Sequence, residues 1–156
     1  MSTEDIERRL QVLEDIEAIK QLKARYCAYC DDGYDPEGIA GLFIDGGVWD
    51  GGRRGRFEGK EAIKGFFVQA AQTFSFALHY VLNPIITVDG DEAHGTWYLF
   101  MPATLRDGNR AVWNAGRYED DYVRVDGKWK FRQLRVAESY FTTPFDAGWA
   151  KERFVD

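Results

Sequence analysis

The feature that most constrains the fold is a change of hydrophobic period near residue 76. Before this point, apolar residues recur every three or four positions; after it, long runs of apolar and aromatic residues follow a period of two. A spacing near 3.6 is typical of amphipathic helices, and alternation is typical of half-buried strands. Helices followed by a sheet define an α+β fold.

The first half of the chain predicts helices joined by marked stops and starts. One apolar stripe ends at the sequence DDGYDP, where Gly33 suits a helix C-terminus and Asp35 with Pro36 suits the start of a short helix. Asp15 could cap the start of a second helix, so the sequence leaves open whether this stripe forms one helix or two. A later helix is expected over 59–74, after the segment DGGVWDGG and a short strand candidate. The stripe contains Ile6, Leu10, Leu13, Ile16, Ile19, Leu22 and Tyr26.

The second half predicts four long strands in an antiparallel meander. The runs cover residues 76–88, 92–105, 109–125 and 128–141, and they are separated by Asp89-Gly90, Asp107-Gly108 and Asp126-Gly127. Asp-Gly between alternating runs is a strong hairpin signal. We expect a curved sheet that closes over the helices and leaves a cavity between them.

Composition narrows the classes of function. The 156 residues suit one domain over 1–156, and the formal charge of −6 argues against nucleic acid as a partner. No apolar run is long enough for a membrane span, and the acidic start has no signal-peptide pattern, so a cytoplasmic protein is expected. The 11 Phe, 8 Tyr and 5 Trp exceed the needs of a small core, which favours a pocket for a hydrophobic small molecule.

Cys27 and Cys30 form a Cys-x-x-Cys, which raises the possibilities of redox or metal chemistry. Both lie near a predicted helix C-terminus, where the helix dipole opposes a thiolate. A second Cys pair or suitably spaced His residues, which a zinc site would need, are missing from the sequence. We therefore predict that both cysteines pack as small apolar side chains, and that the protein uses neither a metal nor a cofactor.

Five segments of the chain carry a family resemblance: DIEAIKQLKARYCAYCDDGYD, LFIDGGVWDGG, GKEAIKGFF, LHYVLNPIITVDGDEAHGTWYL and GRYEDDYVRVDGKWKF. Together they resemble the SnoaL-like family of the nuclear transport factor 2-like superfamily. The resemblance covers nearly the whole chain and implies a cone-shaped half-barrel, with N-terminal helices packed on a strongly bent antiparallel sheet around an apolar pocket. Within the family the chain is similar to bile acid 7α-dehydratase and, less closely, to scytalone dehydratase and ketosteroid isomerase.

The resemblance implies a catalytic set of Tyr26, Asp31 and His79. In this scheme Asp31 orients His79, which removes a substrate proton, while Tyr26 donates a hydrogen bond to a substrate oxygen. Asp32 is the alternative to Asp31, because the DDGYD segment leaves the register open by one residue. Phe100 and Met101 stand where the bile acid enzyme has an acidic residue. The candidate substrate-binding residues, several of which could equally belong to the core, are Arg135, Tyr118, Trp97, Met101 and Trp113.

Two kinds of function follow from this resemblance. The first is a cofactor-independent dehydratase (a lyase) acting on a hydrophobic cyclic hydroxy or keto compound, steroid-like or polyketide-like, with a ketosteroid-isomerase-like isomerase as the alternative. The second is a non-catalytic binding or assembly module. The resemblance also implies a homo-oligomer, either a dimer or a trimer. Convergence of Asp31 and His79 inside a cavity would favour an enzyme, because a binding module has no need of a buried acid–base pair.

Overall fold

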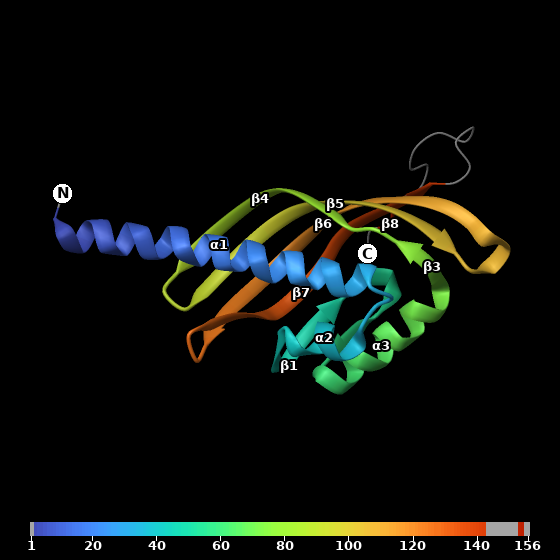
Figure 1. The fold of residues 1–156 in the computed structure, drawn as a ribbon, viewed down its shortest axis with the longest axis horizontal. Coiled ribbons are helices and arrows are strands. Elements are labelled where there is room, and N and C mark those ends of the chain that lie inside the picture. The colour runs from blue at the N-terminus through green and yellow to red at the C-terminus, as the bar shows by residue number, and fades with distance from the viewer. Residues whose placement is uncertain (1, 143–152, 155–156) are drawn as a thin grey trace.

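The fold is described for residues 2–142 and 153–154 of a computed structural model. One long helix lies along a long, strongly curled sheet, and two shorter helices cover one end of it (Figure 1). The helices are α1 (Thr3–Asp31), α2 (Pro36–Gly41) and α3 (Lys60–Thr73). None of the helices within 2–142 is both long enough and apolar enough to cross a membrane.

α1 is one continuous helix, and it does not restart at Asp15. Ser2 caps it through a reciprocal pair of hydrogen bonds with Asp5. Asp15 is buried instead of capping, and its Oδ1 accepts hydrogen bonds from Arg124 Nη1 (2.6 Å) and Trp129 Nε1 (2.9 Å). The two-helix alternative is therefore wrong, because Asp15 ties the middle of α1 to the sheet.

The end of α1 and the start of α2 follow the sequence prediction. Gly33 takes a left-handed conformation (φ 71°) just after the C-cap Asp32. Asp35 then caps α2, since its Oδ1 accepts hydrogen bonds from the backbone N–H groups of Glu37 and Gly38, both at 3.1 Å. This compact turn places the last residue of α1, Asp31, close to the start of α2.

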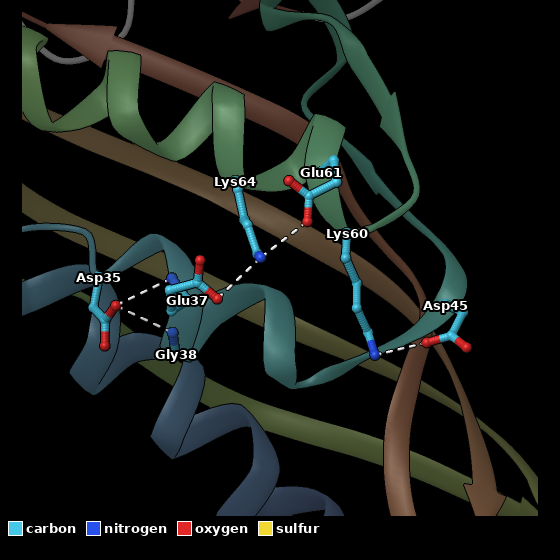
Figure 2. A network of polar contacts seen from close by, with 7 residues as sticks. All are labelled: Asp35, Glu37, Gly38, Asp45, Lys60, Glu61 and Lys64. Atoms are coloured by element: carbon cyan, nitrogen blue, oxygen red, sulfur yellow. Dashed lines mark hydrogen bonds and ion pairs between the residues drawn. The ribbon is translucent and has the colours of Figure 1, made fainter.

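Exposed ion pairs connect α2, α3 and the strand between them, as Figure 2 shows. Lys64 Nζ of α3 contacts Glu37 of α2 at 3.0 Å and Glu61 at 2.9 Å. Lys60 Nζ contacts Asp45 Oδ1 at 2.7 Å. Exposed pairs of this kind contribute little stability each, so apolar packing must hold the two helices on the sheet.

The strands form one curled sheet in the order β2-β1-β7-β6-β5-β3, with β4 also on β5 and β8 on β7. This confirms the α+β half-barrel. The Asp-Gly turns join β4 to β5, β5 to β6 and β6 to β7, as predicted. The strands are β1 (Phe43–Asp50), β2 (Arg56–Glu58), β3 (Phe74–Ala77), β4 (Tyr80–Asp89), β5 (Glu92–Leu105), β6 (Arg110–Val125), β7 (Lys128–Thr142) and β8 (Arg153–Phe154).

Two details of the sheet depart from the predicted meander. β1 pairs with β7 in parallel, with Val48 opposite Gln133, although the other pairs among the described strands are antiparallel. The run expected over 76–88 is also split into β3 and β4, which follow one another along the same edge of β5. The break falls at Leu78 and His79.

The core lies between the concave face of the sheet and the C-terminal half of α1. Ile19, Leu22 and Tyr26 of the predicted stripe are buried, whereas Ile6, Leu10 and Leu13 are at least half exposed. The N-terminal turns of α1 project beyond the strands in Figure 1. Only the second half of the stripe therefore packs within one copy of the chain.

A buried ion pair lies under the sheet beside this core. Lys23 Nζ of α1 contacts Asp120 Oδ2 of β6 at 2.8 Å, and both side chains are fully buried. The ammonium also lies 3.4 Å from the centroid of the Tyr118 ring, and Tyr122 donates a hydrogen bond to the same Asp120 oxygen at 3.0 Å. Burial raises the pKa of Asp120, and the contact with Lys23 partly offsets that effect.

Candidate active site

The site is built where α1 ends and the strand run breaks. Asp31, the last residue of α1, directs Oδ1 at His79, where it accepts hydrogen bonds from the backbone N–H at 2.9 Å and from ring Nδ1 at 2.6 Å. Because His79 lies between β3 and β4, its N–H is available to the carboxylate. The predicted contact between Asp31 and His79 is confirmed.

This contact determines which ring nitrogen can accept a proton. An ionised carboxylate only accepts hydrogen bonds, so the 2.6 Å contact requires a proton on Nδ1. In the neutral ring, Nε2 then carries the lone pair. The side chains are 6% exposed for His79 and 21% exposed for Asp31, so the dyad is largely shielded from water.

His79 borders a small cavity of about 50 Å³ between α1, α3 and the sheet. Its walls are mostly aromatic, with Trp49, Phe66, Phe67 and Phe74 among them. The polar groups on its wall include Tyr26, Tyr34, Tyr118, Arg54 and Asn114. A wall made largely of aromatic rings lowers the local dielectric constant, which strengthens electrostatic interactions with any polar group of a ligand.

Tyr26 lies on the wall of this cavity, as the catalytic hypothesis requires. Its hydroxyl accepts a hydrogen bond from Trp49 Nε1 at 2.9 Å, and its ring meets Phe67 and Phe131 edge-on. Burial raises the pKa of Tyr26 well above its ordinary value. The phenol is therefore neutral and keeps a proton to donate.

Of the five substrate-binding candidates, two line the cavity and three do not. Tyr118 and Met101 are on the wall. Arg135 is exposed and contacts Glu119 at 3.4 Å. Trp97 is buried beyond the cavity, where its Nε1 donates to Tyr122. Trp113 stacks on Phe100, at a ring-centroid separation of 5.1 Å. Among the described residues, Arg135, Trp97 and Trp113 therefore do not line this cavity, and their role in binding a substrate stays a prediction.

Three polar residues on the wall were missed from the sequence: Tyr34, Arg54 and Asn114. Arg54 belongs to the basic sequence RRGR, a composition that is typical of solvated loops. Burial nevertheless lowers the pKa of Arg54 beside the wall tyrosines. Asn114 occupies an inward position in the alternation of β6. A polar residue at an inward-facing strand position is a sequence signal that could have identified Asn114. Tyr34 and Arg54 have no comparable signal in the sequence.

The remaining titratable candidates are either exposed acids and bases or buried thiols. Asp32 is exposed. His94 contacts Asp121 at 2.8 Å, and both side chains are about half exposed. Cys27 and Cys30 are buried free thiols, and burial raises the pKa of Cys27 to about 12. Within the described residues, no group of three or more His, Cys, Asp and Glu side chains could hold a metal ion.

The fold and the site define a SnoaL-like protein of the nuclear transport factor 2-like superfamily. The profile of the SnoaL-like domain matches residues 11–135, so the chain belongs to this family. Its relatives include lyases. Gamma-hexachlorocyclohexane dehydrochlorinase of Sphingobium indicum is 31% identical over 70 residues, which are 44% of this chain and 45% of that protein. The chain thus aligns with less than half the length of this curated relative.

Solved structures show the same architecture. The hexachlorocyclohexane dehydrochlorinase LinA-type3 from Novosphingobium barchaimii superposes with a TM-score of 0.77 at 24% identity, covering 90% of this chain and 94% of that chain. An NTF2-like protein with a cystatin-like fold from Novosphingobium aromaticivorans gives 0.72 at 22% identity, covering 86% and 88%. At these identities the likeness establishes the fold alone.

Proposed function

We propose that the protein is a cofactor-independent lyase that eliminates a small leaving group from a hydrophobic cyclic compound. The observation that carries the proposal is the Asp31–His79 dyad, held at 2.6 Å beside a cavity with aromatic walls. A shielded carboxylate–imidazole pair of this geometry is suited to general base catalysis. A site that only bound its ligand would gain nothing from it.

The reaction begins with transfer of a proton from a substrate carbon to Nε2 of His79. The electron pair of the C–H bond becomes the new carbon–carbon double bond, and the bond to the leaving group on the neighbouring carbon breaks. The leaving group departs with its electron pair. Asp31 stabilises the imidazolium that forms, so the proton is held until solvent removes it.

Two other residues on the cavity wall are suited to assist the departure of the leaving group. Arg54 places a positive charge on the wall of the same cavity as His79, where it would stabilise an anion as it leaves. Tyr26 has a hydroxyl proton to donate, which a departing hydroxyl or a carbonyl oxygen would need. A halide requires no proton, so Arg54 suffices for dehydrohalogenation, and dehydration also needs Tyr26.

The name of the Sphingobium relative supports elimination over isomerisation. That protein is a dehydrochlorinase of hexachlorocyclohexane, a reaction that needs a base and an anion-stabilising group. We assign these two roles to His79 and Arg54, which both line the cavity. We therefore rank elimination of HCl or water from a six-membered ring first, and steroid-like or polyketide-like substrates as larger members of the same class.

The test is a product assay on three sets of compounds: chlorinated cyclohexanes, β-hydroxy cyclic ketones and β,γ-unsaturated cyclic ketones. We expect chloride or water release with formation of an alkene from the first or second set. Conversion of the third set alone would establish an isomerase instead. Wild-type protein that converts none of them, although folded, would contradict the proposal.

A further inference from the structure

The cavity beside His79 is smaller than the proposed substrates. It measures about 50 Å³, whereas an apolar protein cavity that binds benzene measures about 150 Å³. A substituted six-membered ring therefore does not fit between His79 and the aromatic wall unless more space opens. At least one of the side chains that line the cavity must therefore move when such a substrate binds.

A second cavity of about 200 Å³ adjoins the first. Tyr34 and Phe74 line both cavities. The dyad lies at this partition, since His79 borders the small inner cavity and Asp31 borders the larger outer one. The outer cavity is also lined by Ala71, Ser75 and Arg106.

Tyr34 is the principal side chain of the partition. Its ring lies 6.0 Å from Phe67 in a stacked arrangement, 6.0 Å from Phe74 and 6.1 Å from the His79 ring. Its backbone has φ 60°, which is uncommon for a residue other than glycine. Tyr34 therefore occupies a costly conformation at the point where its ring separates the two cavities.

We propose that the two cavities are one binding site, and that Tyr34 is the specificity-determining residue, whose ring moves aside when a substrate enters. This inference rests on the proposed function, because the substrate of that reaction requires the space. The apolar ring of the substrate then lies against Phe66 and Phe67 beside His79. The remainder of the substrate extends past Asp31 into the outer cavity.

The outer cavity also indicates the chemistry of the part of the substrate that would occupy it. Arg106 lines it and donates from Nε to the carbonyl oxygen of Ala71 at 3.3 Å. This bond uses only one of the five N–H groups of a guanidinium. A carboxylate or a ketone oxygen would accept from the others. The substrate class is thus a six-membered ring with a short side chain that ends in an acceptor group.

The test uses 3-cyclohexylpropanoate, which has this shape but no leaving group, so its binding does not depend on catalysis. Its dissociation constant is measured by calorimetry for wild type, Ala71→Phe, Arg106→Gln and Ala18→Phe. Ala71→Phe fills the outer cavity and Arg106→Gln removes its charge. Ala18 lines a separate cavity next to Trp129, so Ala18→Phe is a control for the same change elsewhere.

We expect Ala71→Phe and Arg106→Gln each to weaken binding about tenfold or more, and Ala18→Phe to leave it within about twofold. A crystal structure of the complex should show the carboxylate at Arg106 and the Tyr34 ring displaced. Equal affinity of wild type and Ala71→Phe, no binding by wild type, or a complex with Tyr34 unmoved would each overturn the inference. Each of those results would leave the elimination assay unaffected, so the two proposals can fail separately.

Discussion

At the residue scale, the charge of Asp31 should matter more to the reaction than to the fold. Asparagine at position 31 keeps the shape of the side chain but cannot stabilise an imidazolium. We expect Asp31→Asn to lower kcat/KM by about 10²–10⁴-fold, with little change in the melting temperature because the side chain is partly exposed. Full activity in this variant would remove Asp31 from the mechanism.

The buried thiol of Cys27 gives a prediction that depends on pH. Burial raises its pKa to about 12, from the ordinary value of 9.0, so the thiolate at pH 8 is about a thousandfold rarer than for a free cysteine. Iodoacetamide at pH 8 should therefore leave Cys27 unmodified in the native protein and modify it after unfolding. Rapid native alkylation, followed by mass spectrometry, would contradict a packing role.

The dyad could be predicted from sequence, but the rest of the cavity wall could not. The resemblance to the SnoaL-like family implies the pairing of Asp31 with His79, and this contact is present at 2.6 Å. Arg54 ends a three-residue 3-10 turn (Gly52–Arg54), and Tyr34 lies in the loop between α1 and α2. In such short segments neither helical nor strand periodicity says which way a side chain points. The orientation of Arg135 depends on bulges in the β6–β7 pairing that alternation does not reveal. Trp113 faces away from Asn114 and Tyr118, as the regular alternation of β6 indicates.

At the scale of elements, the Lys23–Asp120 pair should be essential to how α1 packs on β6. Lys23→Met leaves the buried Asp120 without its partner, which typically costs about 3–5 kcal/mol of unfolding free energy. Lys20→Met, an exposed position on the same helix, should cost less than about 0.5 kcal/mol. Urea denaturation measures both changes.

A double variant separates loss of the charge pair from loss of packing. Replacing both partners, as Lys23→Met with Asp120→Leu, removes the uncompensated charge and should recover most of the stability lost in Lys23→Met. If the double variant is as unstable as the single one, the pair stabilises α1 through its detailed hydrogen bonds. The explanation that Lys23→Met is unstable because the charge of Asp120 is left unpaired would then be wrong.

The elements themselves were largely predictable, and the exceptions have physical causes. Asp-Gly turns identify hairpins between neighbours in the chain, so the order β4 to β7 follows directly. β1 pairs in parallel with the distant β7, and no local turn signal encodes such a pairing. The break at Leu78 and His79 could not be seen in the sequence, because these residues lie within a run of strand-like residues. In the structure the backbone N–H of His79 donates a hydrogen bond to the Asp31 carboxylate and not to a neighbouring strand.

At the scale of the whole molecule, the homo-oligomer stays a prediction, and the surface supports it. Large apolar side chains are about half exposed or more along the projecting part of α1 (Ile6, Leu10, Leu13) and on the sheet (Tyr80, Leu82, Ile85, Tyr98). Exposed apolar area of this kind is typical of interfaces. We expect sedimentation velocity to give a mass of two or three times 17.9 kDa, and the double variant Leu10→Glu with Leu13→Glu to reduce that mass. A wild-type monomer would contradict the prediction.

The central claim is that His79 is the base of an elimination reaction, and the two histidines of the chain provide a matched comparison. Each has Nδ1 within 2.8 Å of an aspartate, but His79 borders the cavity and His94 is exposed.

The most direct measurement is the initial rate of alkene formation by wild type, His79→Ala and His94→Ala, using the best substrate from the product assay. We predict that His79→Ala loses at least about 10²-fold in rate while its circular dichroism spectrum is unchanged, and that His94→Ala keeps the wild-type rate. A folded His79→Ala variant with wild-type activity would contradict the account.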